Sequence, residues 1–196
     1  MGVAERRDQP HSGYPGHMAD DVITLLHRQH AQIRSLFAQV ETTTGDERED
    51  AWHELVRLLS IHETAEEEIV HPAVKRVDGG EPVVEARVAE EHRAKELLST
   101  MDRIGPDAEG FDTLLVQLRD DVLAHADHEE QSEFPLLREV YDQERLERMA
   151  KAVEAAEAIA PTRPHPGVES PVANLALGPV VAVVDKARDA IRKVLG

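Results

Sequence analysis

The sequence predicts an all-α protein built on an up-down-up-down four-helix bundle with extra C-terminal helices. The helix-forming residues Ala, Leu, Glu and Arg dominate the composition, and only 3% of the 196 residues are aromatic, so aliphatic side chains must fill the core. Apolar residues recur at steps of three and four along four long segments, as expected for amphipathic helices. Glycine and proline residues separate these segments by short loops, which favours antiparallel neighbours.

The first predicted helix begins at a cap formed by Asp20 or Asp21 and ends at about Thr43. Its core-facing seam contains one histidine among apolar residues: Ile23, Leu26, His30, Ile33, Phe37 and Val40. A turn at Thr44-Gly45 leads to the second helix, over about 46–77, with the seam Trp52, Leu55, Leu59, His62, Glu66, Ile69 and Ala73. Polar residues with ligand chemistry therefore occupy core positions of a hydrophobic pattern.

Two further breaks bound the third and fourth predicted helices. The third helix follows Gly79-Gly80, has Pro82 in its first turn, ends near Ile104 and places on one i+4 ridge Val84, Val88, His92 and Glu96. The fourth helix follows Gly105-Pro106 and spans about 110–141, with the seam Phe111, Leu115, Leu118, Val122, His125, Glu129, Ser132 and Leu136. Each of these helices thus also has polar residues at predicted core positions.

The segments outside the bundle differ in composition. We expect a disordered arm over residues 1–18, the bundle over 19–141, an additional helix over 142–160, a proline-rich linker over 161–178 and an amphipathic helix over 179–196. One face of the last helix contains Val180, Val184, Ala187, Ile191 and Leu195. This face predicts docking on the bundle or on a second subunit rather than on a membrane.

Charge and composition exclude several classes of function. A formal charge of −17 makes nucleic-acid binding unfavourable, because a phosphate backbone would be repelled. The absence of cysteine excludes disulfides, thiolate zinc sites and iron–sulfur clusters. We find neither a signal-peptide-like segment nor an apolar run long enough to span a bilayer, and we expect a soluble cytoplasmic protein without a membrane partner.

A repeated motif indicates the chemistry. The segment HETAEEEIVHP at 62–72 returns as HADHEEQSEFP at 125–135, with a histidine four residues before a glutamate in each copy. Residues i and i+4 share a helix face, so each copy directs an imidazole and a carboxylate the same way. His30 lies 32 residues before His62, and His92 lies 33 residues before His125, which is about one helical hairpin. Two such half-sites facing each other predict a cage for two metal ions, and nitrogen and oxygen donors without sulfur suit iron, manganese or zinc.

With these residues the sequence resembles the hemerythrin-like HHE cation-binding family over about residues 20–141. The resemblance implies a non-haem di-iron centre with an oxo or hydroxo bridge, in which Glu66 and Glu129 are the bridging carboxylates. The candidate metal ligands are His30, His62, Glu66, His92, His125 and Glu129, with Glu96 as a further candidate beside His92.

The third helix departs from the oxygen-carrying members of this family, which have two histidines four residues apart there. Here His92 has Val88 before it and Glu96 after it. A missing nitrogen leaves an open position or a carboxylate ligand such as Glu96. More oxygen ligation stabilises ferric iron, which favours peroxide, nitric oxide or iron chemistry over reversible oxygen carriage.

Other polar residues near the motifs have less specific roles. His27 is expected to be a half-exposed neighbour of the site. Glu67 and Glu130 either receive the N–H of a ligand histidine or are solvated charges. His71 and Phe134 precede the prolines of the two repeats, and we expect both to close the end of the bundle.

We therefore expect a di-iron protein that reacts with peroxide, oxygen or nitric oxide, in oxidative or nitrosative stress or in iron handling. Whether it is an enzyme, with catalase-like or nitric oxide-reacting turnover, stays open. The alternative is a non-catalytic module that binds oxygen or nitric oxide reversibly or senses iron. The expected partners are small diatomic or peroxide ligands, and the expected assembly is a monomer or a homodimer.

Overall fold

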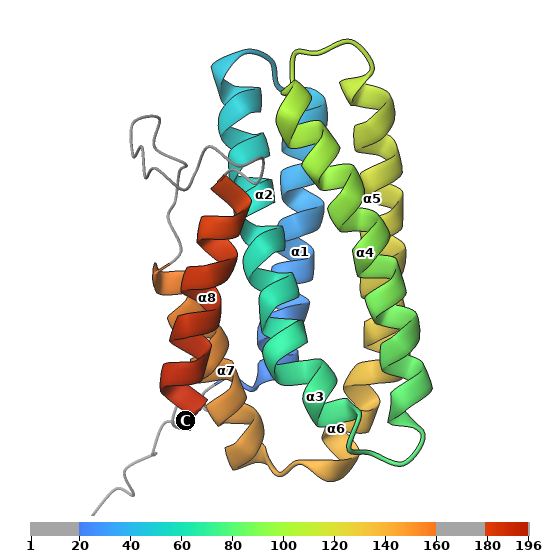
Figure 1. Ribbon diagram of the computed structural model, residues 1–196, viewed down its shortest axis with the longest axis vertical. Helices are drawn as coiled ribbons and strands as arrows, with labels where there is room; N and C mark the ends of the chain where they lie inside the picture. The colour runs from blue at the N-terminus through green and yellow to red at the C-terminus, as the bar shows by residue number, and fades with distance from the viewer. Residues whose placement is uncertain (1–19, 160–178, 196) are drawn as a thin grey trace, which may run out of the picture.

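Four long helical rods lie side by side, and two further helices pack along one side of them (Figure 1). This computed structural model describes residues 20–159 and 179–195, so the predicted N-terminal arm and proline-rich linker lie outside the described residues. The elements are α1 (Val22–Thr42), α2 (Asp46–Ala65), η1 (Glu66–Val70), α3 (His71–Val74), α4 (Gly80–Ile104), α5 (Phe111–His128), η2 (Glu129–Glu133), α6 (Phe134–Val140), α7 (Gln143–Ile159) and α8 (Pro179–Leu195). The predicted all-α four-helix bundle is confirmed.

The first and third rods begin as their sequences predict. Asp21 caps α1, and its carboxylate accepts a hydrogen bond of 2.7 Å from the backbone N–H of Thr24. Gly79 has a φ of 77°, a left-handed conformation that glycine adopts without strain. At Gly80 an added Cβ would lie 2.0 Å from the carbonyl oxygen of Val74, so only glycine fits the close approach of these two rods.

The core consists of two hydrophobic clusters with polar residues between them. One cluster fills the end of the bundle near α3 and α6 and contains Leu26, Ile61, Val70, Phe134 and Val153. The other fills the opposite half and contains Phe37, Trp52, Leu55, Leu98 and Leu118. Between them lies the polar layer, which we define as five buried residues: His30, His62, Glu66, His125 and Glu129. Because buried polar groups are costly unless they are paired or bind a ligand, this layer needs a chemical explanation.

The second and fourth rods each contain one widened turn. The backbone N–H of His71 bonds the carbonyl of Glu66, and that of Phe134 bonds the carbonyl of Glu129, so both bonds span five residues instead of four. A proline follows each turn. Proline has no N–H and its ring clashes with the carbonyl four residues earlier, which the wider π-type turn relieves. The same bulge therefore occurs in both copies of the repeated motif.

The core-facing side of α4 differs from the predicted i+4 ridge. Its buried residues are Val84, Arg87, Glu91, Ala94, Leu98 and Met101. An α-helix turns every 3.6 residues, so a ridge of steps of four drifts around the helix, whereas alternating steps of three and four keep to one side. The expected inward placement of His92 and Glu96 is wrong, since their side chains are 73% and 70% exposed, and Val88 is exposed as well.

Helices α7 and α8 occupy the two segments where C-terminal helices were expected. They pack against each other, α7 lies against α1, and both lie against α2 (Figure 1). Ala187 and Ile191 of α8 are buried, and Arg188 donates a hydrogen bond of 2.6 Å to Glu68. Helix α8 therefore docks on the bundle.

Among the described helices, none combines the length and the apolar character needed to cross a membrane.

Candidate metal centre

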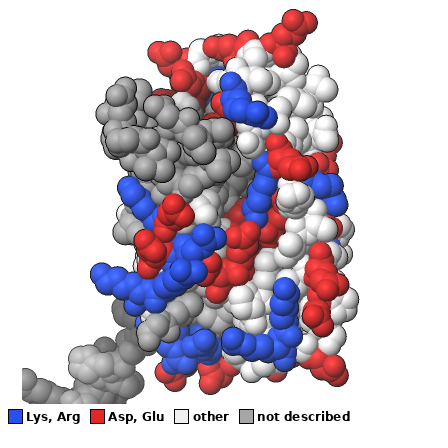
Figure 2. All heavy atoms as spheres, in the orientation of Figure 1, with Lys and Arg blue, Asp and Glu red and all other residues white. Residues whose placement is uncertain are grey.

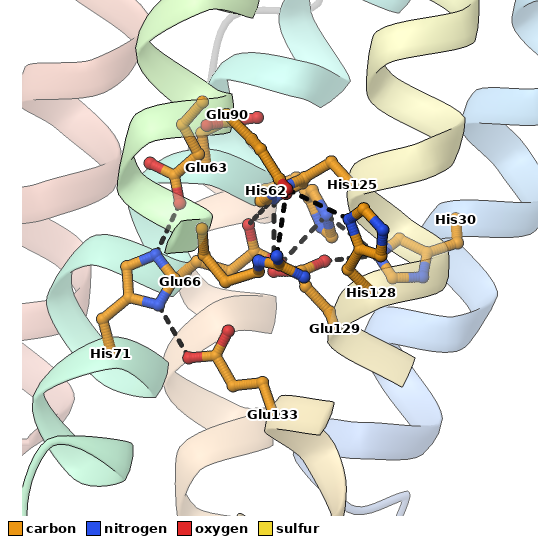
Figure 3. Close-up of polar contacts among 12 residues, drawn as sticks. His30, His62, Glu63, Glu66, His71, Glu90, His125, His128, Glu129 and Glu133 are labelled. Carbon is orange, nitrogen blue, oxygen red and sulfur yellow. Dashed lines mark hydrogen bonds and ion pairs between the residues drawn. The ribbon is translucent and has the colours of Figure 1, made fainter. Parts of the chain in front are cut away.

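The structure brings five of the seven predicted ligands together in the polar layer. The five side chains converge from α1, α2, α5 and the two widened turns (Figure 3). Nε2 of His30 lies 3.1 Å from Nε2 of His62 and 3.2 Å from Oε2 of Glu129. Nε2 of His62 lies 3.1 Å from Oε1 of Glu66. These four residues place one ligand atom each within 4.8 Å of one another, which is close enough to surround a single cation.

A second group of ligand atoms lies on the other side of the same two carboxylates. Nε2 of His125 lies 3.4 Å from Oε1 of Glu129 and 3.9 Å from Oε2 of Glu66. Each glutamate therefore presents one oxygen to His30 or His62 and the other oxygen to His125. Glu63, which the sequence did not single out, joins Glu66 and His125 in this second group. The arrangement suits two adjacent cations that share Glu66 and Glu129.

The outer nitrogen of each imidazole is held by a polar side chain. Nδ1 of His30 lies 2.7 Å from a carboxylate oxygen of Glu130. Nδ1 of His62 lies 3.0 Å from the amide oxygen of Gln29, and Nδ1 of His125 lies 3.1 Å from the carboxylate of Glu90. An acceptor at Nδ1 fixes the ring and directs Nε2 into the layer. All three imidazoles are thus oriented as metal ligands are.

Burial and the neighbouring charges shift the pKa values of the groups in the layer. Burial and the nearby imidazole of His30 lower the pKa of His62 to about 3, so His62 is neutral. Burial and the carboxylate of Glu129 raise the pKa of Glu66 well above its usual value. Burial opposes a charge on His125, but the carboxylates of Glu129 and Glu66 raise the pKa of His125 to about 12. A proton on His125 therefore takes the place that a cation would fill, and cation binding would release it.

The donor atoms themselves fit a metal. Within the described part of the chain, no hydrogen bond reaches either carboxylate oxygen of Glu66 or of Glu129, or Nε2 of His125. Buried polar atoms of a folded protein normally make hydrogen bonds, and five that make none around one point are expected where the protein binds a ligand. The donors are imidazole nitrogens and carboxylate oxygens in a chain without cysteine, a set that suits iron, manganese or zinc.

His92 and Glu96 are the two candidates that the structure does not bring to the layer. They lie on the outer face of α4, where Nε2 of His92 is 3.4 Å from a carboxylate oxygen of Glu96. Glu91, which immediately precedes His92, is buried instead. The seven-residue spacing of Val84, Glu91 and Leu98, which is close to two helical turns, was the sequence signal that could have identified it.

Glu91 belongs to a second buried network beside the polar layer. Nε2 of His71 lies 2.5 Å from Oε1 of Glu91, and Nδ1 of His71 lies 2.8 Å from Oε1 of Glu133. Burial opposes a charge on His71, but the two carboxylates raise the pKa of His71 to about 9, so the imidazole is positively charged at neutral pH. Lys95 adds a second cation, 3.0 Å from Glu91. This network joins α3, α4 and η2 next to the site.

The other polar and aromatic residues singled out near the two motifs lie around the polar layer or beside it. Side-chain exposure of 45% agrees with the half-exposed position expected for His27, which lies 3.3 Å from Glu130. Phe134 is buried and stacks on the ring of His30, with 5.9 Å between ring centroids. Glu130 contacts Nδ1 of His30, which is one of the two alternatives predicted for this residue. Glu67 accepts a hydrogen bond from Lys95 instead.

Comparison with known proteins bears out the resemblance read from the motifs. The family model of the Hemerythrin HHE cation binding domain matches residues 21–137. A hemerythrin-like protein of Schizosaccharomyces pombe is 25% identical over 172 residues, which cover 86% of this chain and 85% of that protein. A DNA nickase of Nostoc sp. is 26% identical over 133 residues, which cover 67% of this chain but 38% of the nickase.

A solved structure shows the same fold. It is the crystal structure of a Hemerythrin HHE cation binding domain-containing protein from Mycobacterium kansasii, with a TM-score of 0.65 and 22% sequence identity. The match covers 85% of this chain and 99% of that one, so it extends beyond the residues that the family model matches.

Proposed function

Since this chain belongs to the hemerythrin HHE cation binding domain family, we propose that its polar layer holds two iron ions and reacts with peroxide, oxygen or nitric oxide. The first ion would be bound by His30, His62, Glu66 and Glu129, and the second by His125, Glu63 and the remaining oxygens of Glu66 and Glu129. Iron would supply redox chemistry that none of these side chains has alone.

One observation supports two cations more than any other. Glu66 and Glu129 are fully buried, and each directs its two oxygens to opposite sides without a hydrogen bond from the described residues. A single cation would leave one oxygen of each carboxylate, and Nε2 of His125, without a metal–ligand bond. Two cations would give all five atoms a ligand bond and would neutralise the buried charge.

The unequal halves favour reaction over reversible binding. The half with His30 and His62 offers two nitrogens, whereas the half with His125 and Glu63 offers one nitrogen and an additional carboxylate. Oxygen-rich ligation stabilises the ferric state, and four protein donors at each ion would leave room for a small ligand. The alternative is non-catalytic binding of oxygen or nitric oxide, or iron sensing, and an oxidation experiment distinguishes it from reaction with peroxide.

The DNA nickase of Nostoc does not indicate a nucleic-acid partner for this chain. The matched region is 38% of the length of that DNA nickase. The formal charge of −17 would repel a phosphate backbone. We propose that the partners are small uncharged oxidants or diatomic molecules rather than nucleic acid.

The test is to load the protein with ferrous iron without oxygen, measure iron per chain, and then add peroxide or air. We expect two iron ions per chain, ferric absorption after oxidation, and oxygen release from hydrogen peroxide. The variant His125→Ala should lose one iron ion, while His92→Ala, on the surface, should keep both. A stable absorption change that deoxygenation reverses would favour the binding alternative, and equal iron content in His125→Ala and the wild type would refute the assignment.

A further inference from the structure

Glu90 is the carboxylate that holds His125, and two further groups contact it. Oε2 of Glu90 lies 3.1 Å from Nδ1 of His125. Oε1, its other oxygen, lies 3.1 Å from Nδ1 of His128 (Figure 3). The same Oε1 accepts a hydrogen bond of 2.9 Å from Nη2 of Arg87. Glu90 therefore has one oxygen on a histidine of the polar layer and the other on Arg87 and His128.

Arg87 is a buried cation with few hydrogen bonds. Lys and Arg side chains normally lie at the surface beside Asp and Glu, as Figure 2 shows for the face on which α4 lies. Arg87 is instead 7% exposed, and its Nε and Nη1 make no hydrogen bond with a described residue. A guanidinium has five N–H donors, and burying its charge costs stability unless those donors are paired. The bond that Arg87 does make, to Glu90, therefore indicates a role through that carboxylate.

The hydrogen bond from Arg87 fixes the orientation of the Glu90 carboxylate. A glutamate side chain has three torsions, so a carboxylate that is held at one oxygen alone can rotate away from its partner. Arg87 lies three residues before Glu90 on the same helix and holds Oε1, which keeps Oε2 within reach of His125. His128 contacts the same Oε1, but its side chain is 50% exposed and water competes for that contact. The orientation of the His125 imidazole thus depends chiefly on Arg87.

The other half of the polar layer contains a similar arrangement at the surface. Glu130 holds Nδ1 of His30, and Nη2 of Arg34 lies 3.8 Å from the same carboxylate oxygen. The side chain of Arg34 is 39% exposed, and it donates a hydrogen bond of 3.0 Å to Asp127 instead. An exposed ion pair contributes little, because water and salt screen it. Arg34 is therefore a matched control for Arg87.

We propose that Arg87 is a positioning residue of the metal centre, which fixes Glu90 and through it the imidazole of His125 at the second cation position. The proposal deepens the proposed function and rests on it for the second cation. The placement of His125 by Arg87 does not require a cation, so it can also be measured in the metal-free protein.

The first measurement follows the imidazole NMR signals of His125 and His30 in the full metal-free chain. It compares the wild type with Arg87→Gln and Arg34→Gln. Glutamine is shorter than arginine and has no charge, so at position 87 it cannot hold Glu90 in the same place. Arg87→Gln should shift the signals of His125 and leave those of His30 unchanged, whereas Arg34→Gln should leave both unchanged.

The second measurement is a zinc titration in competition with a chelator, since zinc is a redox-inert cation for nitrogen and oxygen donors. The imidazole signals of His125 and His62 identify the two cation positions. Loss of an outer partner of a ligand histidine weakens metal binding about 10- to 100-fold, so Arg87→Gln should weaken zinc binding at His125 about tenfold. Zinc binding at His62 should change much less. Arg87→Lys keeps the charge and a donor and should restore most of the affinity.

A double-mutant cycle tests whether Arg87 acts through Glu90. Glu90→Gln should by itself weaken zinc binding at His125 about tenfold. Adding Arg87→Gln to it should cause no further loss, because residues that act as one unit are not additive. If Arg87→Gln does not fold, the wild type supplies the test, since the side-chain signals of Arg87 should shift when zinc binds at His125 and those of Arg34 should shift much less.

Unchanged His125 signals in folded Arg87→Gln, equal losses of zinc affinity at both positions, or additive losses in the cycle would overturn the proposal. A wild type that binds no zinc at His125 would refute the second cation position, while the signals of the metal-free protein still decide the role of Arg87. Failure of the iron-loaded protein to react with peroxide would refute the proposed function and leave both measurements intact, so the failures are distinguishable.

Discussion

Replacing His71 with glutamine should destabilise the metal-free protein, and the loss should be greater in mildly acidic than in alkaline solution. The imidazole of His71 lies between the carboxylates of Glu91 and Glu133, at 2.5 and 2.8 Å, and is almost fully buried. Burial opposes its charge, but the two carboxylates raise the pKa of His71 from 6.5 to about 9. Glutamine keeps a polar group at the position without the positive charge.

The sign and size of the effect follow from this pKa difference. A group with a higher pKa in the folded state contributes stability that is fully present below its unfolded pKa and is lost as the pH rises through its folded pKa. For His71 the window runs from about pH 6.5 to about pH 9. One pKa unit corresponds to about 1.36 kcal/mol, so a shift from 6.5 to about 9 amounts to roughly 3 kcal/mol.

The assay is urea unfolding of the wild type and of His71→Gln at about pH 6 and about pH 9.5, on either side of the window. The difference in unfolding free energy should shrink by roughly 3 kcal/mol between the two conditions. His92→Gln is the control, because His92 is 73% exposed and should change stability little at either pH. A difference of the same size at both pH values would show that His71 is not held as a buried cation, and would refute the reasoning.

Two further predictions concern the core and the layer. Leu55 is completely buried, so Leu55→Ala should lower the unfolding free energy, measured in denaturant, by about 2 to 5 kcal/mol. The control Val116→Ala, at an exposed position, should change the unfolding free energy little. Similar losses in both variants would contradict the packing described. Glu130→Gln weakens the acceptor at Nδ1 of His30 and should reduce metal affinity about 10- to 100-fold in a competition titration with a chelator. Glu67→Gln, the same change in the other repeat, should leave affinity unaltered because Glu67 bonds Lys95, and equal effects of the two changes would exclude this role for Glu130.

Local sequence patterns were sufficient for the helices and for most of the polar layer. Steps of three and four place His30, His62 and His125 on the buried faces of their helices, and steps of four add Glu66 and Glu129 beside two of these histidines. The hairpin spacing brings His30 and His62 to a common level, whereas the matching spacing of His92 and His125 does not join those two residues, because His92 lies on the surface. These features depend on the 3.6-residue turn and on chain length, which any single sequence contains.

The sequence contains a signal for the two wide turns, but the turns were not predicted from it. Both copies of the motif have a proline ten residues after the histidine. The structure places a five-residue hydrogen bond before each proline, from His71 to Glu66 and from Phe134 to Glu129. The repeat of the proline was visible, but how a helix accommodates it depends on neighbours that absorb the change of direction.

The sequence by itself determined an all-α bundle, a repeated His-x-x-x-Glu motif and five of the polar residues that meet at its centre. Only the tertiary structure decided the rotation of α4, which turns Glu91 inward and leaves His92 on the surface. It also decided that Glu63 lies beside Lys95 and joins Glu66 and His125. The physical reason is that periodicity fixes which residues share a face of one helix, while the packing of all the helices fixes which face turns inward and what it meets.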